Sequence, residues 1–246
     1  MPFSISEGLL SVRKFSSVAD NLQSMLGLDF PPVAVVRVNE PPKDVPRFKG
    51  GVPAGCAFWR RAEKDLFYAD AEAHMGCPIG AMVMGFELSE SKTEELMRLV
   101  GDMCAVAYLE EDEVAELPSF DLGASGVVYG PLADFTQDPD VVLVWVTPQQ
   151  AMLLEETVGG TRWTSEGGGS VLGRPACGAL PRAGDIDSVA LSLGCAGMRT
   201  FTEIPDQYAL VAIPQNQLNG LEASLNKTVA ANGQMTITYQ AMKTAV

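Results

Sequence analysis

A six-residue run near the start of the chain, apolar except for Arg37, sets the first limit on the fold. The run, 33–38, is rich in β-branched residues and lies between the proline pairs 31–32 and 41–42. Proline lacks a backbone N–H and fixes its φ angle, so a helix cannot continue through either pair, whereas β-branched residues favour a strand. The sequence therefore predicts one short, well-bounded strand, preceded by a helix over 18–26.

Similar patterns alternate along the rest of the chain, without a composition break or an internal repeat. Apolar runs predict further strands, and capped or amphipathic segments predict further helices. We therefore predict a single cysteine-containing domain over 1–246, of α/β or mixed α+β class, with a central sheet flanked by helices. The strands are expected at 126–130, 141–146, 189–193, 209–213 and 236–239, and the helices at 57–64, 78–86, 94–104, 148–156 and 214–232.

One long connection is expected inside this domain. The segment 161–182 is glycine-rich and contains three consecutive glycines at 167–169. Neither a Walker pattern nor a strand-bound GxGxxG is present, so a plain loop or a lid over a ligand is predicted in place of a phosphate-binding loop.

The charge of the chain excludes some classes of partner. Lys and Arg number 17 against 31 Asp and Glu, which gives a formal net charge of −14. Nucleic acid and anionic membrane surfaces are therefore unexpected partners. The sequence has no apolar run of membrane-spanning length and no recognisable secretory signal, so we expect a cytoplasmic protein whose cysteines serve metal binding, redox chemistry or packing in preference to disulfides.

The most informative residues are four cysteines that lie beside glycine or proline in short, turn-like stretches: Cys56, Cys77, Cys177 and Cys195. The fifth, Cys104, falls in an apolar stretch with helical spacing and is expected to pack in the core. Cys77 precedes Pro78, which places it at the N-terminus of a helix, where a thiol pKa is normally lowered.

Arginines accompany these cysteines along the sequence. Arg60 and Arg199 each follow a cysteine by four residues, and Cys177 lies between Arg174 and Arg182. In an acidic chain such clustering predicts a local positive site, suited to thiolates, to an anionic cluster or to a small anionic ligand. Arg60 and Arg199 are the expected contacts to the bound group.

The cysteine spacing leaves three interpretations open. No Cys-x-x-Cys pair is present, which argues against a zinc ribbon, but four dispersed thiolates can hold an iron–sulfur cluster if the fold gathers them. Alternatively, the cysteines are inert and buried in a metal-free module that binds a small molecule or a partner. The third interpretation is a thiol enzyme with Cys77 as nucleophile and His74, the single histidine, as base. Aromatic residues near these positions, Trp59, Trp163 and Phe201, would wall a pocket.

Short stretches spread along the chain form one ordered pattern. They are Gly27-Leu28, Pro31 to Val35, Cys56 with Arg60 to Ala62, Cys77-Pro78 with Gly80 and Gly85, Gly173 to Gly178, Gly194-Cys195 with Arg199, and Ile213-Pro214. In this pattern the chain resembles the "domain of unknown function 169" family of archaeal and bacterial proteins over most of its length. The resemblance implies a shared cysteine-centred site, with Cys56, Cys77 and Cys177 in the pattern, and it names no reaction.

The resulting hypothesis is a cytosolic [4Fe–4S] protein, or another cysteine-ligated metal protein, in which Cys56, Cys77, Cys177 and Cys195 are the ligands. Four ligands favour electron transfer to a redox partner. With only three, an open iron would act as a Lewis acid or take up a sulfur or oxygen atom from a substrate.

Overall fold

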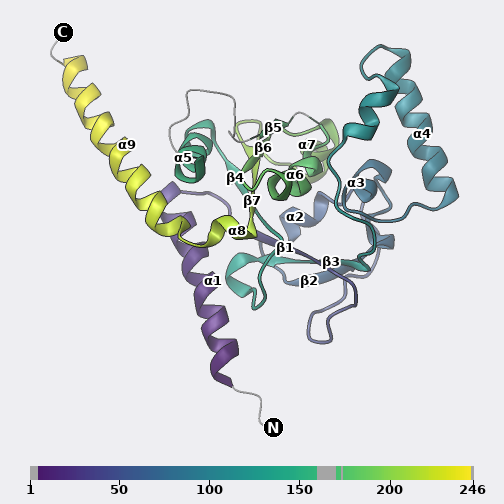
Figure 1. The fold of residues 1–246 in the computed structure, drawn as a ribbon, viewed down its shortest axis with the longest axis horizontal. Coiled ribbons are helices and arrows are strands. Elements are labelled where there is room, and N and C mark those ends of the chain that lie inside the picture. Colours follow the sequence, from purple (N-terminus) through teal and green to yellow (C-terminus); the bar gives the residue numbers. More distant parts are fainter. Residues whose placement is uncertain (1–4, 160–169, 173, 245–246) are drawn as a thin grey trace.

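The computed structural model describes residues 5–159, 170–172 and 174–244, and its strands form one seven-stranded sheet (Figure 1). The strand order is β2-β3-β1-β4-β7-β6-β5; neighbours are antiparallel except β5 and β6, which are parallel. The mixed α+β class with a central sheet flanked by helices is thereby confirmed. The strands are β1 Val33–Val38, β2 Phe67–Asp70, β3 Gly126–Pro131, β4 Val141–Val146, β5 Ser170–Leu172, β6 Ala190–Ser192 and β7 Ala209–Pro214.

Side chains of the central strands alternate between two separate apolar cores, as the two-residue period of a strand requires. In β1, Val33 and Val35 enter one core, whereas Ala34 and Val36 enter the other. All six residues of β4 are buried, so this strand is covered on both faces. The face that carries Val33 and Val35 is called the thiol face below, and the opposite one the long-helix face.

The two faces are covered by different kinds of helix. On the long-helix face lie α1, α5 and α9, with side chains such as Phe15, Leu154 and Leu225 in the core. The thiol face is covered by short helices and turns. The helices are α1 Ile5–Leu26, α2 Ala57–Arg61, α3 Pro78–Val83, α4 Glu90–Ala105, α5 Pro148–Gly159, α6 Ala179–Asp185, α7 Ala196–Thr202, α8 Gln215–Leu218 and α9 Leu221–Thr244, with 3₁₀ turns η1 Glu72–His74, η2 Glu111–Glu116, η3 Leu132–Asp134 and η4 Ala176–Gly178.

Some of the expected elements were wrong. The strand expected at 236–239 is part of α9, which is anchored at its start by Leu221 and Leu225 and extends past the body of the protein (Figure 1). Burial of that first turn on the long-helix face, with continuous backbone hydrogen bonding, outweighs the β-branched composition of 236–239.

The connection expected over 161–182 is shorter than predicted, because β5 lies within it and a helical stretch, 176–185, begins within it. The three glycines at 167–169 and Trp163 lie outside the described residues. Cys104 is only half-buried, since Leu96 and Val100 are the residues of α4 that face the body. Strand β2 was not predicted. Within the described ranges, no helix has both the length and the apolar character needed to cross a membrane.

Candidate functional site

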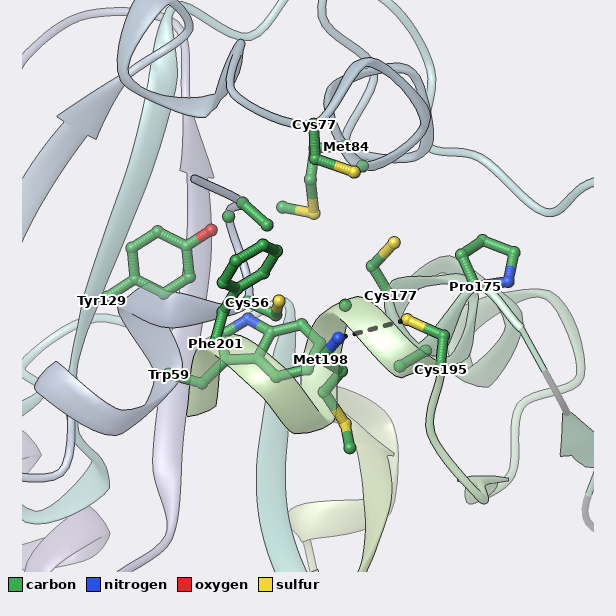
Figure 2. A pocket seen from close by; sticks show the side chains of 15 residues that line it. Cys56, Trp59, Cys77, Met84, Tyr129, Pro175, Cys177, Cys195, Met198 and Phe201 are labelled. Atoms are coloured by element: carbon green, nitrogen blue, oxygen red, sulfur yellow. Dashed lines mark hydrogen bonds between the residues drawn. The ribbon is translucent and has the colours of Figure 1, made fainter. Parts of the chain in front are cut away.

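Four cysteines meet at one cavity of about 70 Å³ on the thiol face (Figure 2). They arrive from four separate segments: the starts of α2, α3 and α7, and the turn η4. Two of these segments precede the central strands β3 and β4 in the chain and two follow them, so the fold brings together residues more than a hundred positions apart. The lining residues are Ala54, Gly55, Cys56, Trp59, Cys77, Gly80, Met84, Tyr129, Pro175, Ala176, Cys177, Cys195, Gly197, Met198 and Phe201.

The four thiols are mutual neighbours. In each of the six pairs that they form, the charge of one thiolate raises the pKa of another. Gly80 lies between two of them: a Cβ atom at this position would be 3.5 Å from Sγ of Cys77 and 4.0 Å from Sγ of Cys177. The missing side chain of Gly80 therefore leaves open the space between these two sulfurs.

Each cysteine stands at the start of a short helical segment, where backbone N–H groups have no partner within the helix. Sγ of Cys195 accepts the N–H of Met198 at 3.4 Å. Backbone N–H groups of Ile79 and Gly80 favour the thiolate of Cys77, and that of Ala57 favours the thiolate of Cys56. The chain thus supplies main-chain donors to sulfur where side-chain cations are absent.

The backbone conformation at Gly194 explains why a glycine precedes Cys195. Gly194 has a φ of +90°, and a Cβ there would lie 2.5 Å from Cε of Met198. Only glycine adopts this backbone without strain, and the turn it makes directs Cys195 to the beginning of α7.

Burial nevertheless favours the protonated form of three of the thiols, those of Cys56, Cys77 and Cys177. Desolvation, and next the charges of Cys195 and Cys77, raise the pKa of Cys56 to about 12. The pKa values of Cys77 and Cys177 are raised as well, mainly by burial. The lowered pKa expected for Cys77 at its helix N-terminus was therefore wrong, because desolvation outweighs its two N–H contacts. A cation that binds here has to displace protons.

The spacing of the cysteines does not suit a single ion. Among the residues that the structure describes, no group of three or more His, Cys, Asp or Glu could hold a metal ion. Around one zinc ion each sulfur lies about 2.3 Å from the metal, so two ligand sulfurs are less than about 5 Å apart. The four thiols therefore share one cavity without forming a single-ion site among the described residues.

Both arginines expected at the site are engaged elsewhere. Arg60 pairs with Glu63 and lies over the ring of Phe30, 4.4 Å from its centroid. Arg199 donates to the carbonyl oxygens of Leu193 and Tyr208, at 2.8 and 3.1 Å. Neither lines the cavity.

His74 is buried, and both of its ring nitrogens have partners. Nδ1 lies 2.7 Å from the carbonyl oxygen of Asp70, and Nε2 lies 3.0 Å from the hydroxyl of Tyr129. A carbonyl only accepts, so Nδ1 donates and the hydroxyl of Tyr129 donates to Nε2. Burial lowers the pKa of His74 to about 4. No ring nitrogen is left to take a proton from Cys77, which removes the basis for a Cys-His thiol enzyme.

Sequence reasoning missed Tyr129 and Met84. Tyr129 is the one residue with a polar tip in the apolar run of β3, and the strand period places it on the thiol face with Val127. Buried tyrosines normally need a partner for the hydroxyl, so this position carried a usable signal.

Comparisons with known proteins give one match. A family model described as "Uncharacterised ArCR" (DUF169) matches residues 21–224, a stretch that includes all four cavity cysteines. No curated protein and no solved structure matches the chain.

Proposed function

The chain belongs to the uncharacterised DUF169 family, and we propose that its four-cysteine cavity binds a [4Fe–4S] cluster through Cys56, Cys77, Cys177 and Cys195. The supporting observation is the mutual adjacency of four thiols from four segments of the chain. Such convergence is expected of a ligand set. A cluster spreads its ligands over several iron atoms, so it accepts a wider set of sulfurs than one ion does.

The surroundings supply what a thiolate-bound cluster needs. Main-chain N–H groups face the sulfurs and compensate negative charge. The remaining walls are largely apolar; Trp59 and Met84 among them are buried, whereas Phe201 is exposed to solvent. Hydrogen bonds to sulfur and solvent exposure are the properties by which proteins set cluster potentials.

Electron transfer is the chemistry that follows from four ligands. The proposed partner is a redox protein or small redox carrier, and not a small anion, since the two arginines are paired elsewhere. Five free thiols suit a reducing compartment such as the cytoplasm. The net charge of −14 argues against a nucleic-acid partner.

The test is anaerobic reconstitution of the full chain with iron and sulfide, followed by quantification of both and by electron paramagnetic resonance. We expect about four irons per chain, the number in a [4Fe–4S] cluster. Replacing each cavity cysteine by serine should abolish or sharply reduce iron binding.

The matched control is Cys104→Ser, which removes a half-buried thiol from α4, outside the cavity lining. This variant should bind iron like the wild type. If Cys195→Ser alone retains the cluster, three cysteines ligate and one iron is open. A colourless, iron-free wild type after reconstitution rejects the proposal.

The second candidate is a metal-free module that binds a small apolar molecule. The raised thiol pKa values and the apolar walls favour it. Cysteines that remain unreactive in a stable, metal-free protein would support this function. Loss of the folded state on treatment with an iron chelator would exclude it.

A further inference from the structure

Two tryptophans lie side by side on the thiol face but differ in hydrogen bonding. The rings of Trp59 and Trp145 are 6.1 Å apart, and each residue is 2% exposed. Nε1 of Trp145 donates to Oε1 of Glu63 at 3.0 Å. Nε1 of Trp59 has no hydrogen-bond partner in the part of the chain that the structure describes. Unlike Trp145, Trp59 lines the cavity.

The N–H of Trp59 is not sealed in the core. In the described residues, the fully buried polar side-chain atoms without a hydrogen bond are Nε of Arg37, Oγ of Ser188 and Nη1 of Arg199, and Nε1 of Trp59 is not one of them. Since Trp59 lines the cavity, its N–H reaches the space inside it. A phenylalanine would fill the same wall without presenting a donor. The acceptor of the Trp59 N–H is therefore expected in the molecule that occupies the cavity.

The local sequence explains why this donor belongs to the cysteine site. Cys56 and Trp59 are three residues apart at the first turn of α2, so their side chains lie on the same side of that turn. Figure 2 shows the indole of Trp59 beside the sulfur of Cys56, at the edge of the cavity. Trp59 and Cys56 thus approach the occupant together.

No other lining side chain offers a free N–H or O–H donor, apart from the thiols themselves. The hydroxyl of Tyr129 gives its hydrogen to His74. The remaining lining residues carry no such group. The indole N–H is the single nitrogen donor that a side chain directs at the site.

We propose that Nε1–H of Trp59 donates a hydrogen bond to a sulfur of the bound cluster, either the thiolate of Cys56 or a bridging sulfide. This inference rests on the proposed function and adds a residue that tunes the cluster. Reduction adds one electron, taken from an external low-potential reductant, and breaks no bond. The added negative charge strengthens the N–H···S hydrogen bond, so the donor stabilises the reduced state and raises the reduction potential.

The experiment compares Trp59→Phe with Trp145→Phe, each in the reconstituted full chain. Both variants remove one indole from the same core, but only Trp59→Phe removes the cavity donor. We expect wild-type iron content in both, a reduction potential shifted to more negative values in Trp59→Phe, and an unshifted potential in Trp145→Phe. The potentials are measured by mediated titration with dithionite.

The outcomes separate this inference from the proposed function. An iron-free wild type rejects both. A wild type with a cluster, together with an unchanged potential in Trp59→Phe, overturns the donor role alone. If Trp59→Phe does not fold or assemble, the test uses the isosteric analogue of tryptophan in which sulfur replaces the indole N–H; an unshifted potential with that analogue overturns the inference equally.

Discussion

The two faces of the sheet are built from the same strands but hold different kinds of residue. The long-helix face is closed by α1, α5 and α9, and no cysteine belongs to its described core. The thiol face holds the four cavity cysteines, Trp59 and the His74–Tyr129 pair. Long helices cover a face continuously, whereas short helices present many N-termini. The comparison separates a face that is closed by long helices from a face on which the cysteines and the cavity lie.

The sharpest test of this division is Gly80→Ala, which places a methyl group between two cavity sulfurs. Its Cβ would make ordinary contacts, 3.5 Å from Sγ of Cys77 and 4.0 Å from Sγ of Cys177. Gly80 lies within α3, where alanine is favoured over glycine by about 0.5–1 kcal/mol. We expect a metal-free protein at least as stable as the wild type that has lost most of its capacity for iron, measured by thermal unfolding and iron analysis.

Gly184→Ala is the matched control for Gly80→Ala. This glycine lies in α6, and a Cβ there would meet no atom within 4 Å. The control should gain similar helix stability and keep its iron. Normal iron content in Gly80→Ala would show that the space between the sulfurs is not used.

The scaffold could be predicted from the sequence better than the site. The runs 33–38 and 141–146 form central strands, as predicted. Their β-branched residues favour a strand over a helix, and the proline or turn residues on either side prevent a helix from continuing through them. Strand β2 escaped prediction because its four residues include an aspartate at the end and lack a β-branched residue. The 236–239 segment shows the reverse error, since its composition favours a strand while the helix started upstream runs through it.

The sequence allowed us to predict that the cysteines lie together, but not which groups the arginine side chains contact. Glycine beside cysteine indicated turns at which backbone N–H groups reach sulfur. Arg60 follows Cys56 by four residues, yet its charge pairs with Glu63, and Arg199 is held by the carbonyl of Tyr208 from a later segment. Proximity along the chain does not decide which of several acceptors a long side chain reaches.

Matched core truncations test whether the faces separate stability from binding. Leu154 in α5 and Leu180 in α6 are both almost fully buried, on the long-helix face and the thiol face respectively. Replacement of either by alanine should lower the free energy of unfolding by about 2–5 kcal/mol. Only Leu180→Ala should also weaken iron binding, because α6 follows directly on the turn that carries Cys177.

Urea unfolding of the metal-free proteins measures the change in the free energy of unfolding. The iron content of the folded, reconstituted proteins measures the change in iron binding. An equal loss of iron in Leu154→Ala and Leu180→Ala would break the division between the two faces. Unchanged iron in both would confine the site to the cysteine turns themselves.

The smallest expected effect is an acid sensitivity that arises on the thiol face. Burial lowers the pKa of His74 from 6.5 to about 4 in the folded protein. The unfolded chain therefore binds more protons between these values, and the free energy of unfolding falls as the pH drops from 6.5 towards 4. The loss attributable to His74 is at most about 3 kcal/mol, since one pKa unit corresponds to about 1.4 kcal/mol.

His74→Gln separates this contribution from those of other groups, because the amide does not titrate in this range. Urea unfolding of the metal-free wild type and the variant, at several values between pH 7 and pH 4, should give curves that converge as the pH falls. The variant is less stable at pH 7, where it lacks the paired imidazole between Asp70 and Tyr129, and it loses less stability on acidification. Parallel curves would mean that His74 does not titrate differently in the folded and unfolded chains, and the acid sensitivity would then have to come from carboxylates elsewhere in the protein.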